Sequence, residues 1–136
     1  MRVKEIMHGV TKISFWSSVS EAARIMDERA IGSALIEENG RVIGIMTERD
    51  ILRKIVAKGK NPDKVKVKDI MNDPVVTIDA NEDILEASKI MDEKKIRRLI
   101  VVENGKIVGK ITANSISRNL KYMIVREPQV YSRAEY

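Results

Sequence analysis

The sequence predicts an α+β protein, an α/β-type sandwich in which two β-α-β-β-α motifs pack through their sheets with pseudo-two-fold symmetry. Three observations lead to this fold class: an internal repeat, helix-spaced apolar residues after a capping signal, and a tight-turn signal between two short apolar runs. The chain has 136 residues, of which 43% are hydrophobic and 33% charged. This composition excludes a disordered polymer, and the length allows one ordinary domain or two very small ones.

Three blocks of sequence occur twice, in the same order and 64 or 65 residues apart. They are Val3–Met7 with Val67–Met71, Ile25–Glu28 with Ile90–Glu93, and Glu38–Gly44 with Glu103–Gly109. The chain is therefore a tandem duplication. We expect motif 1 over residues 1–60, motif 2 over residues 61–120 and a C-terminal tail over residues 121–136. A copy of about 65 residues buries too little surface to be stable alone, so the two copies are expected to pack together.

Each copy predicts the same series of elements. In the first copy, a short strand (10–13) leads to a capping box at Ser18–Glu21 and to a helix with an apolar stripe. A strand (33–36), the turn signal Asn39-Gly40, a return strand (42–46) and a helix after Thr47 follow. The second copy repeats them with strands at 75–78, 99–102 and 107–111. Residues 57–64 are expected to link the two copies.

The composition also excludes several functions. The chain has no cysteine and one histidine, which excludes disulfides, a thiolate metal site and a histidine-rich metal site. No apolar run approaches the roughly 20 residues of a membrane span, and the N-terminus lacks the apolar core of a signal peptide. We therefore expect a cytoplasmic protein without a membrane. A nucleophile elbow, a P-loop and a G-x-G-x-x-G loop are missing, so no catalytic residue is predicted.

A net charge of +5 raises the question of nucleic-acid binding. Only 4% of the residues are aromatic, and the basic residues are spread along the chain, so stacking platforms and a concentrated basic patch are not predicted. A well-solvated surface explains the charge better, and nucleic-acid binding stays the alternative.

One candidate site lies at a strand-to-helix junction, Gly44–Asp50 (GIMTERD). The hydroxyl of Thr47 and the N–H groups of a helix N-terminus can bind an anion, and the carboxylate of Asp50 can accept two hydrogen bonds from a vicinal diol such as that of ribose. The alternative is a plain helix cap, with Thr47 as N-cap and Asp50 at the third helical position. The second copy keeps the threonine, Thr112, and has Ser115 in place of the aspartate.

A second candidate is the pair Arg97-Arg98, which stands directly before an apolar strand. Two guanidinium groups at such a boundary suit a phosphate or a carboxylate, although a charged end of a helix and strand is an equal alternative. The first copy has Gly32-Ser33 at the matching place. This asymmetry is expected if the two halves contribute different groups to one ligand.

These motifs resemble the cystathionine-β-synthase (CBS) domain, and residues 1 to about 120 look like one tandem CBS pair, a Bateman module. The resemblance rests on the two lead-in blocks VKEIM and VKDIM, the helices SVSEAARIM and ILEASKIM, the two hairpins and the TERD segment. Ile100 stands where the family commonly has proline. The resemblance implies a regulatory module and not an enzyme. Its expected ligand is an adenosine compound: AMP, ADP or ATP, with S-adenosylmethionine or NAD also open.

The resemblance further implies which residues bind, in clefts between the two motifs. One cleft would hold the ribose with the T-x-x-D element, the adenine with apolar residues and the phosphates with arginines: Thr47, Asp50, Val75, Val76, Ile96, Arg97 and Arg98. A second cleft lacks the aspartate and is expected to be weaker or empty: Thr11, Ile31, Gly32, Thr112 and Ser115.

Proteins of this family and size commonly form disc-like homodimers, so we expect a homodimer that buries the helix faces 51–56 and 116–120. Its ligand state would be transmitted to a regulated partner protein that the sequence does not name. The alternatives are a constitutive scaffold without a nucleotide and a nucleic-acid-associated protein. The tail either covers a dimer edge or a partner, or is disordered.

Overall fold

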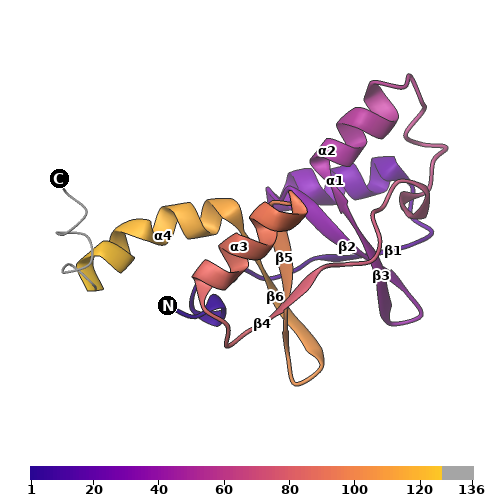
Figure 1. Ribbon diagram of the computed structural model, residues 1–136. Coiled ribbons are helices and arrows are strands. Elements are labelled where there is room, and N and C mark those ends of the chain that lie inside the picture. Colours follow the sequence, from indigo (N-terminus) through magenta and orange to yellow (C-terminus); the bar gives the residue numbers. More distant parts are fainter. Residues whose placement is uncertain (127–136) are drawn as a thin grey trace. The chain divides into compact units, whose positions relative to one another are not determined.

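The computed structural model describes the backbone of residues 1–126 and the side chains of residues 1–120, and it confirms the duplicated α+β class. Two three-stranded mixed sheets are present (Figure 1). One consists of β1 (Lys12–Ser14), β2 (Ser33–Glu38) and β3 (Arg41–Thr47), and the other of β4 (Thr77–Asp79), β5 (Arg98–Glu103) and β6 (Lys106–Thr112). In each sheet the central strand is parallel to the first strand and antiparallel to the third.

The helices begin and end where local chemistry predicts. Helix α1 (Val19–Arg29) begins at Ser18, whose hydroxyl accepts a hydrogen bond from the N–H of Glu21 at 3.1 Å, which is the cap half of the predicted box. Helix α3 (Ile84–Lys94) begins at Asp83 in the same way. Helix α2 (Glu48–Ile51) continues as a π-helical segment (Leu52–Val56).

Helix α4 (Ala113–Arg126) is longer than the predicted boundary at residue 120. The first six residues of the expected tail therefore belong to this helix, and residues 127–136 lie outside the described residues. No helix within residues 1–126 combines the length and the apolar character that crossing a membrane requires.

The predicted hairpin turns are confirmed by their backbone angles. Asn39 and Gly40 have φ values of 52° and 78°, and Asn104 and Gly105 have the same values. A two-residue turn with both φ angles positive matches the twist of the strands it joins. Each turn therefore fixes the register of its hairpin, β2–β3 or β5–β6.

One of the two compact units of the structure is built from two separate stretches of chain. One unit is Val10–Val75, and the other consists of Met1–Gly9 together with the chain from Val76 onward. The lead-in block of each repeat thus folds with the body of the other repeat. The N–H of Val3 donates to the carbonyl of Glu82 at 2.8 Å, and the N–H of Val67 donates to the carbonyl of Ser17 at 2.9 Å. The boundaries 1–60 and 61–120 describe the sequence repeat, whereas the compact units exchange its first segments.

Two glycines make this exchange sterically feasible. A Cβ at Gly44 in β3 would lie 2.9 Å from the carbonyl oxygen of Asn72, and a Cβ at Gly109 in β6 would lie 2.7 Å from that of His8. Both distances are too short for a side chain, so only glycine lets the lead-in segment run directly against the strand. Hydrogen bonds in both directions, Asn72 with Ile45 and His8 with Lys110, then hold each lead-in segment in place.

Each unit has its own apolar core, built from its first helix, its sheet and its lead-in block. In the unit Val10–Val75 the core joins Val19 and Met26 of α1 to Ile36 of β2, and Val67 completes it. In the other unit the core joins Ile84 and Met91 of α3 to Leu99 and Val101 of β5, and Val3 completes it. Val3 and Val67 are fully buried, so each core contains an apolar anchor from the other repeat.

Candidate functional site

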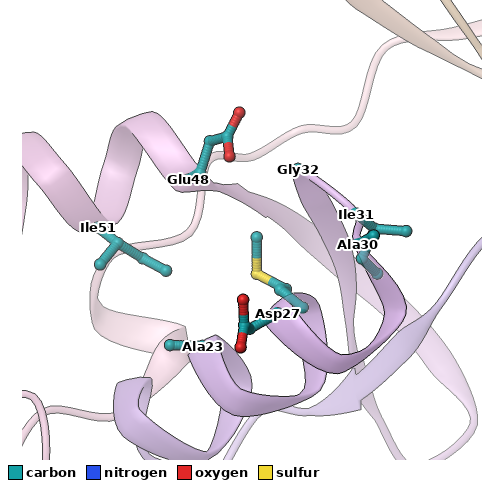
Figure 2. Close-up of a pocket in the computed structure, with 8 residues that line it drawn as sticks. Ala23, Asp27, Ala30, Ile31, Gly32, Glu48 and Ile51 are labelled. Carbon is teal, nitrogen blue, oxygen red and sulfur yellow. The ribbon is translucent and has the colours of Figure 1, made fainter.

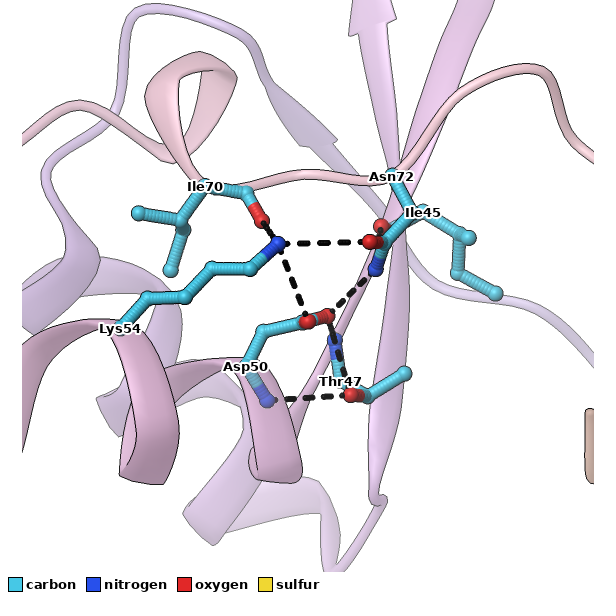
Figure 3. Close-up of polar contacts among 6 residues, drawn as sticks. All are labelled: Ile45, Thr47, Asp50, Lys54, Ile70 and Asn72. Carbon is cyan, nitrogen blue, oxygen red and sulfur yellow. Dashed lines mark hydrogen bonds and ion pairs between the residues drawn. The ribbon is translucent and has the colours of Figure 1, made fainter.

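Thr47 and Asp50 form a reciprocal cap at the start of α2 (Figure 3). The N–H and the hydroxyl of Thr47 donate to Oδ2 of Asp50 at 2.8 and 3.0 Å, and the N–H of Asp50 donates back to the Thr47 hydroxyl at 3.2 Å. The amide of Asn72 donates to the same Oδ2 at 2.8 Å. The cap that the sequence offered as an alternative is therefore present, and Asn72 from the second repeat's lead-in segment reinforces it.

The other carboxylate oxygen of Asp50 has a different environment. Oδ1 lies 3.3 Å from Nζ of Lys54, which also donates to the carbonyl of Ile70 at 2.8 Å. Oδ2 accepts all three hydrogen bonds of the cap network, so Oδ1 is the oxygen with lone pairs left for an incoming hydroxyl donor.

The pKa of Asp50 is lower than its ordinary value. Burial alone would raise this pKa, but the hydrogen bonds from Thr47 and Asn72 and the nearby Lys54 ammonium together outweigh burial. The carboxylate is thus ionised at neutral pH in a position where only 11% of its side chain is exposed.

The matching place in the second repeat carries no charge. Ser115 is 3% exposed, and its hydroxyl lies 2.7 Å from that of Thr112 and 3.0 Å from Nε2 of His8. His8 takes the place that Asn72 has in the other unit, since it follows Met7 in its lead-in segment as Asn72 follows Met71. The hydroxyl of Ser115 is thus held by Thr112 and His8, and this place offers a diol no carboxylate.

Arg98 shares one face of its sheet with a lysine that the sequence analysis missed. Arg98 of β5 is opposite Thr112, and Lys110 is two residues from Thr112 on β6, so the three side chains lie on the same face. The pKa of Lys110 is lowered by its burial and by the neighbouring Arg98. Two cations held close together in a partly desolvated place favour an anion between them.

Arg97 lies elsewhere. With Ile96 it lines a groove between α3 and α4, whereas Ile31 and Gly32 line the matching groove between α1 and α2. The two neighbouring arginines therefore belong to different surfaces.

Two predicted residues, Thr11 and Val76, have structural partners within their own unit. The hydroxyl of Thr11 accepts a hydrogen bond from Arg29 at 3.1 Å. Val75 ends the unit Val10–Val75, and the carbonyl of Val76 accepts the N–H of Ile100 at 3.0 Å. The predicted pairing of these residues with Thr47 and Asp50, or with Thr112 and Ser115, stays a prediction.

The residues that the sequence analysis missed had a signal in the repeat itself. Lys110 stands where the first copy has Ile45, and Lys54 corresponds to Asn119. At both positions the two copies differ in charge although the surrounding helix or strand matches. Arg97 and Asp50 differ from their counterparts in the same way. Within the described residues, no group of three or more His, Cys, Asp or Glu side chains is arranged to hold a metal ion.

Comparison with known proteins agrees with the repeat. The sequence matches the CBS domain family over residues 3–57 and again over residues 67–122. An uncharacterized protein of Methanopyrus kandleri is 45% identical over 106 residues, which is 76% of this chain and 54% of that protein. The chain thus spans about half the length of this relative.

Two similar proteins have known structures. A putative signal-transduction protein with CBS domains from Burkholderia ambifaria has a TM-score of 0.81 at 26% identity, covering 88% of this chain and 93% of that one. Hypoxic response protein 1 of Mycobacterium tuberculosis is 33% identical over 86% of this chain and 83% of its own length. A structure of Hypoxic Response Protein I with two coordinated zinc ions has a TM-score of 0.72 at 31% identity, over 87% of this chain and 98% of that one. The chain belongs to the CBS domain family and carries two copies of the domain.

Proposed function

We propose that this CBS pair is a regulatory module that binds a phosphorylated adenosine of the AMP, ADP or ATP class, catalyses no reaction, and transmits its ligand state to a partner protein. The observation that carries the proposal is the cationic pair on the sheet of the second repeat, Arg98 and Lys110. Both side chains lie on one face of the sheet, and burial and Arg98 lower the pKa of Lys110, so the pair offers two neighbouring cations to a phosphate.

Asp50 is the proposed ribose ligand. Its Oδ1 has lone pairs left for a hydroxyl, and the surrounding network already holds the carboxylate ionised and in one orientation. Such preorganisation lowers the entropy cost of binding. The adenine is assigned to the apolar residues that the family resemblance implies, Val75, Val76 and Ile96. Because Ser115 and Thr112 offer no carboxylate, we propose one strong site per chain.

Calorimetric titration with adenosine, AMP, ADP and ATP tests the phosphate part of the proposal. Affinity should rise with the number of phosphates in wild type, and this rise should disappear in Lys110→Met. Lys106→Met is the matched control, since Lys106 is an exposed lysine on the same strand, and it should bind as wild type does. Equal affinity for adenosine and ATP in wild type would refute the phosphate assignment.

The ribose part has its own test. A charge-assisted hydrogen bond contributes about 1.5 to 3 kcal/mol, so 2′-deoxy-ATP should bind roughly ten- to a hundredfold more weakly than ATP. Equal binding of the two nucleotides would refute the role of Asp50 while leaving the phosphate assignment intact.

We further propose that the protein is a homodimer. Large apolar side chains are exposed on the segment after α2 and on α4: Leu52 at 58%, Val56 at 65% and Leu120 at 44%. Burying such side chains in a helix-to-helix contact would be favourable. Light scattering coupled to size-exclusion chromatography measures the mass directly.

A second candidate function is favoured by one surface feature. Trp16 is 56% exposed, and the ammonium groups of Lys66 and Lys68 lie 5.2 and 4.6 Å from its ring centroid. An exposed indole beside two cations suits a single-stranded nucleic acid, through base stacking and phosphate contacts. Retention of a labelled single strand that falls steeply with salt and is lost in Trp16→Asn would support this function.

A further inference from the structure

The single histidine of the chain, His8, belongs to a chain of hydrogen-bonded side chains at the start of α4. Its Nε2 lies 3.0 Å from the hydroxyl of Ser115, which lies 2.7 Å from the hydroxyl of Thr112. The Thr112 hydroxyl also accepts the N–H of Ser115 at 3.0 Å. His8 is exposed and Ser115 is buried, so this chain leads from the surface, through Ser115, to Thr112.

Two cations lie on the same face of the sheet as Thr112 and His8. Arg98 is opposite Thr112 in the β5–β6 ladder, and Lys110 is two residues before Thr112 on β6. The backbones of His8 and Lys110 exchange hydrogen bonds of 2.8 and 2.9 Å, so the two residues are directly opposite and their side chains share a face. Arg97 lies elsewhere, because it lines the groove between α3 and α4, whose counterpart in the other unit is shown in Figure 2. We call the following residues the His8 cluster: His8, Arg98, Lys110, Thr112 and Ser115.

The first repeat has a carboxylate of its own at the equivalent place. The Thr47 hydroxyl donates to Oδ2 of Asp50 at 3.0 Å, and the amide of Asn72 donates to the same oxygen at 2.8 Å. The hydroxyl proton of the threonine is therefore directed inward, to a negative charge of the protein itself. The second repeat has no carboxylate at this place, since Ser115 corresponds to Asp50 and His8 to Asn72.

The protonation state of His8 sets the direction of the hydrogen bonds in the second repeat. An imidazole whose proton is on Nδ1 accepts at Nε2, so the Ser115 hydroxyl donates to His8 and the Thr112 hydroxyl donates to Ser115. An imidazolium donates from both nitrogens, so Ser115 accepts from His8 and donates to Thr112. The Thr112 oxygen then receives both the hydroxyl and the N–H of Ser115, and its own proton is available to a ligand.

We propose that the second repeat holds a phosphate group with Arg98, Lys110 and the hydroxyl of Thr112, and that protonation of His8 strengthens this binding. The inference rests on the proposed phosphate site and adds to it a hydroxyl donor and a dependence on pH. Protonation places a third positive charge beside the two cations and turns the Thr112 proton toward the ligand, so both effects favour an anion. By linkage, the bound anion favours the protonated ring to the same extent.

The charged groups around His8 are mostly basic. The charged residues of its lead-in segment, of the sheet strands β5 and β6 and of the described side chains of α4 include Lys4, Arg98, Glu103, Lys106, Lys110 and Arg118. Glu103 is opposite Lys106, at the end of the hairpin away from Arg98. Glu5 of the lead-in segment accepts the N–H of Arg2 at 2.6 Å. The His8 cluster itself contains no carboxylate, in contrast to the equivalent place of the first repeat.

NMR of the imidazole protons gives a direct test, because the chain has one histidine and its signals report the titration of His8 alone. Sulfate is the probe, since its charge is the same at pH 6 and pH 8, whereas that of a phosphate monoester changes. We expect sulfate to bind about tenfold more tightly at pH 6 than at pH 8, and to move the midpoint of the His8 titration to higher pH. Sodium chloride at the same ionic strength is the control for screening. Equal sulfate affinity at both pH values with an unchanged midpoint would overturn the proposal.

His8→Asn is the matched variant, because the first repeat has Asn72 at this place and folds with it. An amide does not titrate, so this variant should bind sulfate equally well at pH 6 and pH 8. Lys4→Met removes an exposed cation from the same lead-in segment and should keep the pH dependence of wild type. A His8→Asn variant that keeps this dependence would show that another group is responsible and that the role of His8 is wrong.

ATP distinguishes a failure of this inference from a failure of the proposed function. Sulfate should weaken the binding of ATP by competition, since both anions would occupy the His8 cluster. If ATP binds more tightly than adenosine and its affinity responds to Lys110→Met but not to His8→Asn at pH 6, the phosphate site stands and the role of His8 is overturned. If sulfate binds with the expected pH dependence while ATP binds no better than adenosine, the role of His8 stands and the nucleotide assignment fails.

Discussion

Replacing Asp50 by alanine removes the centre of the polar network at the start of α2. The carboxylate accepts hydrogen bonds from the N–H and hydroxyl of Thr47 and from the amide of Asn72, and its other oxygen pairs with Lys54. Asn72 belongs to the exchanged lead-in segment, so this network also attaches that segment to the body of the unit. We expect Asp50→Ala to destabilise the protein more than the loss of an ordinary helix cap would.

The size of the effect follows from the groups left behind. A lost cap costs about 0.5 to 2 kcal/mol, and a partly buried donor without a partner costs about 1 to 3 kcal/mol. Because some of these donors can reach water at a carboxylate that is 11% exposed, we expect a net loss of about 2 to 3 kcal/mol. In urea unfolding this loss corresponds to a midpoint about 1 M lower, provided that the slope of the transition does not change.

The pH dependence of stability distinguishes the contribution of the Asp50 charge from that of the shape of its side chain. The folded-state pKa of Asp50 lies below its unfolded value, so the carboxylate stabilises the fold above the unfolded value of about 3.9, and this contribution is lost as the pH falls through the folded pKa. Asp50→Asn keeps an acceptor for the Thr47 N–H but cannot ionise. Its stability should therefore fall less than that of wild type between neutral pH and pH 3.

Asp63→Asn is the control for this experiment, since Asp63 is an exposed carboxylate in the same unit. The free energy of unfolding of this variant should fall between neutral pH and pH 3 by as much as that of wild type. If Asp50→Asn and wild type lose the same free energy of unfolding on acidification, the network does not hold the carboxylate ionised and the argument from its geometry is wrong.

Three further predictions concern other parts of the chain. Gly44→Ala should destabilise by about 1 to 3 kcal/mol because its Cβ would meet the backbone of Asn72, whereas Gly9→Ala, with open space around it, should not; urea unfolding of both variants checks this. Trp16→Asn should change the free energy of unfolding by no more than about 0.5 kcal/mol, because the equivalent residue of the second repeat is Asn81 and the unit folds with it; a larger loss would show that the indole is structural. Lys110→Met should abolish the extra stabilisation by ATP over adenosine, because it removes one cation of the proposed phosphate site; thermal scans with each ligand measure this.

The elements of the fold could be predicted because their signals are local. Ser18 caps α1, and Asn39-Gly40 forms the turn that its φ preferences require, so each signal acts within a few residues. The exchange of the lead-in blocks could not be predicted in this way. VKEIM and VKDIM are nearly the same sequence, so nothing local shows which body each block joins, and the decision depends on contacts far apart in the chain such as Val3 with Glu82.

The candidate site was predictable only in part, for a related reason. The sequence identified Thr47 and Asp50 because they stand at a strand-to-helix junction, and it identified Arg97 and Arg98 because they stand directly before an apolar strand and have no arginine counterpart in the first copy. It did not identify Asn72, which reaches Asp50 through the exchange. It also treated the two arginines as one group, whereas Arg98 is the first residue of β5 and Arg97, before the strand, lines the groove between α3 and α4.

Several charge differences between the repeats lie at equivalent positions of the two units. The first repeat has a carboxylate where the second has a neutral residue, as at Asp50 and Ser115, and the second has a cation where the first has none, as at Lys110 and Ile45. Lys54, which corresponds to Asn119, is a difference of the opposite sign, so each position has to be interpreted from its own contacts. The first difference supplies the carboxylate of the proposed ribose site, and the second supplies one cation of the proposed phosphate site.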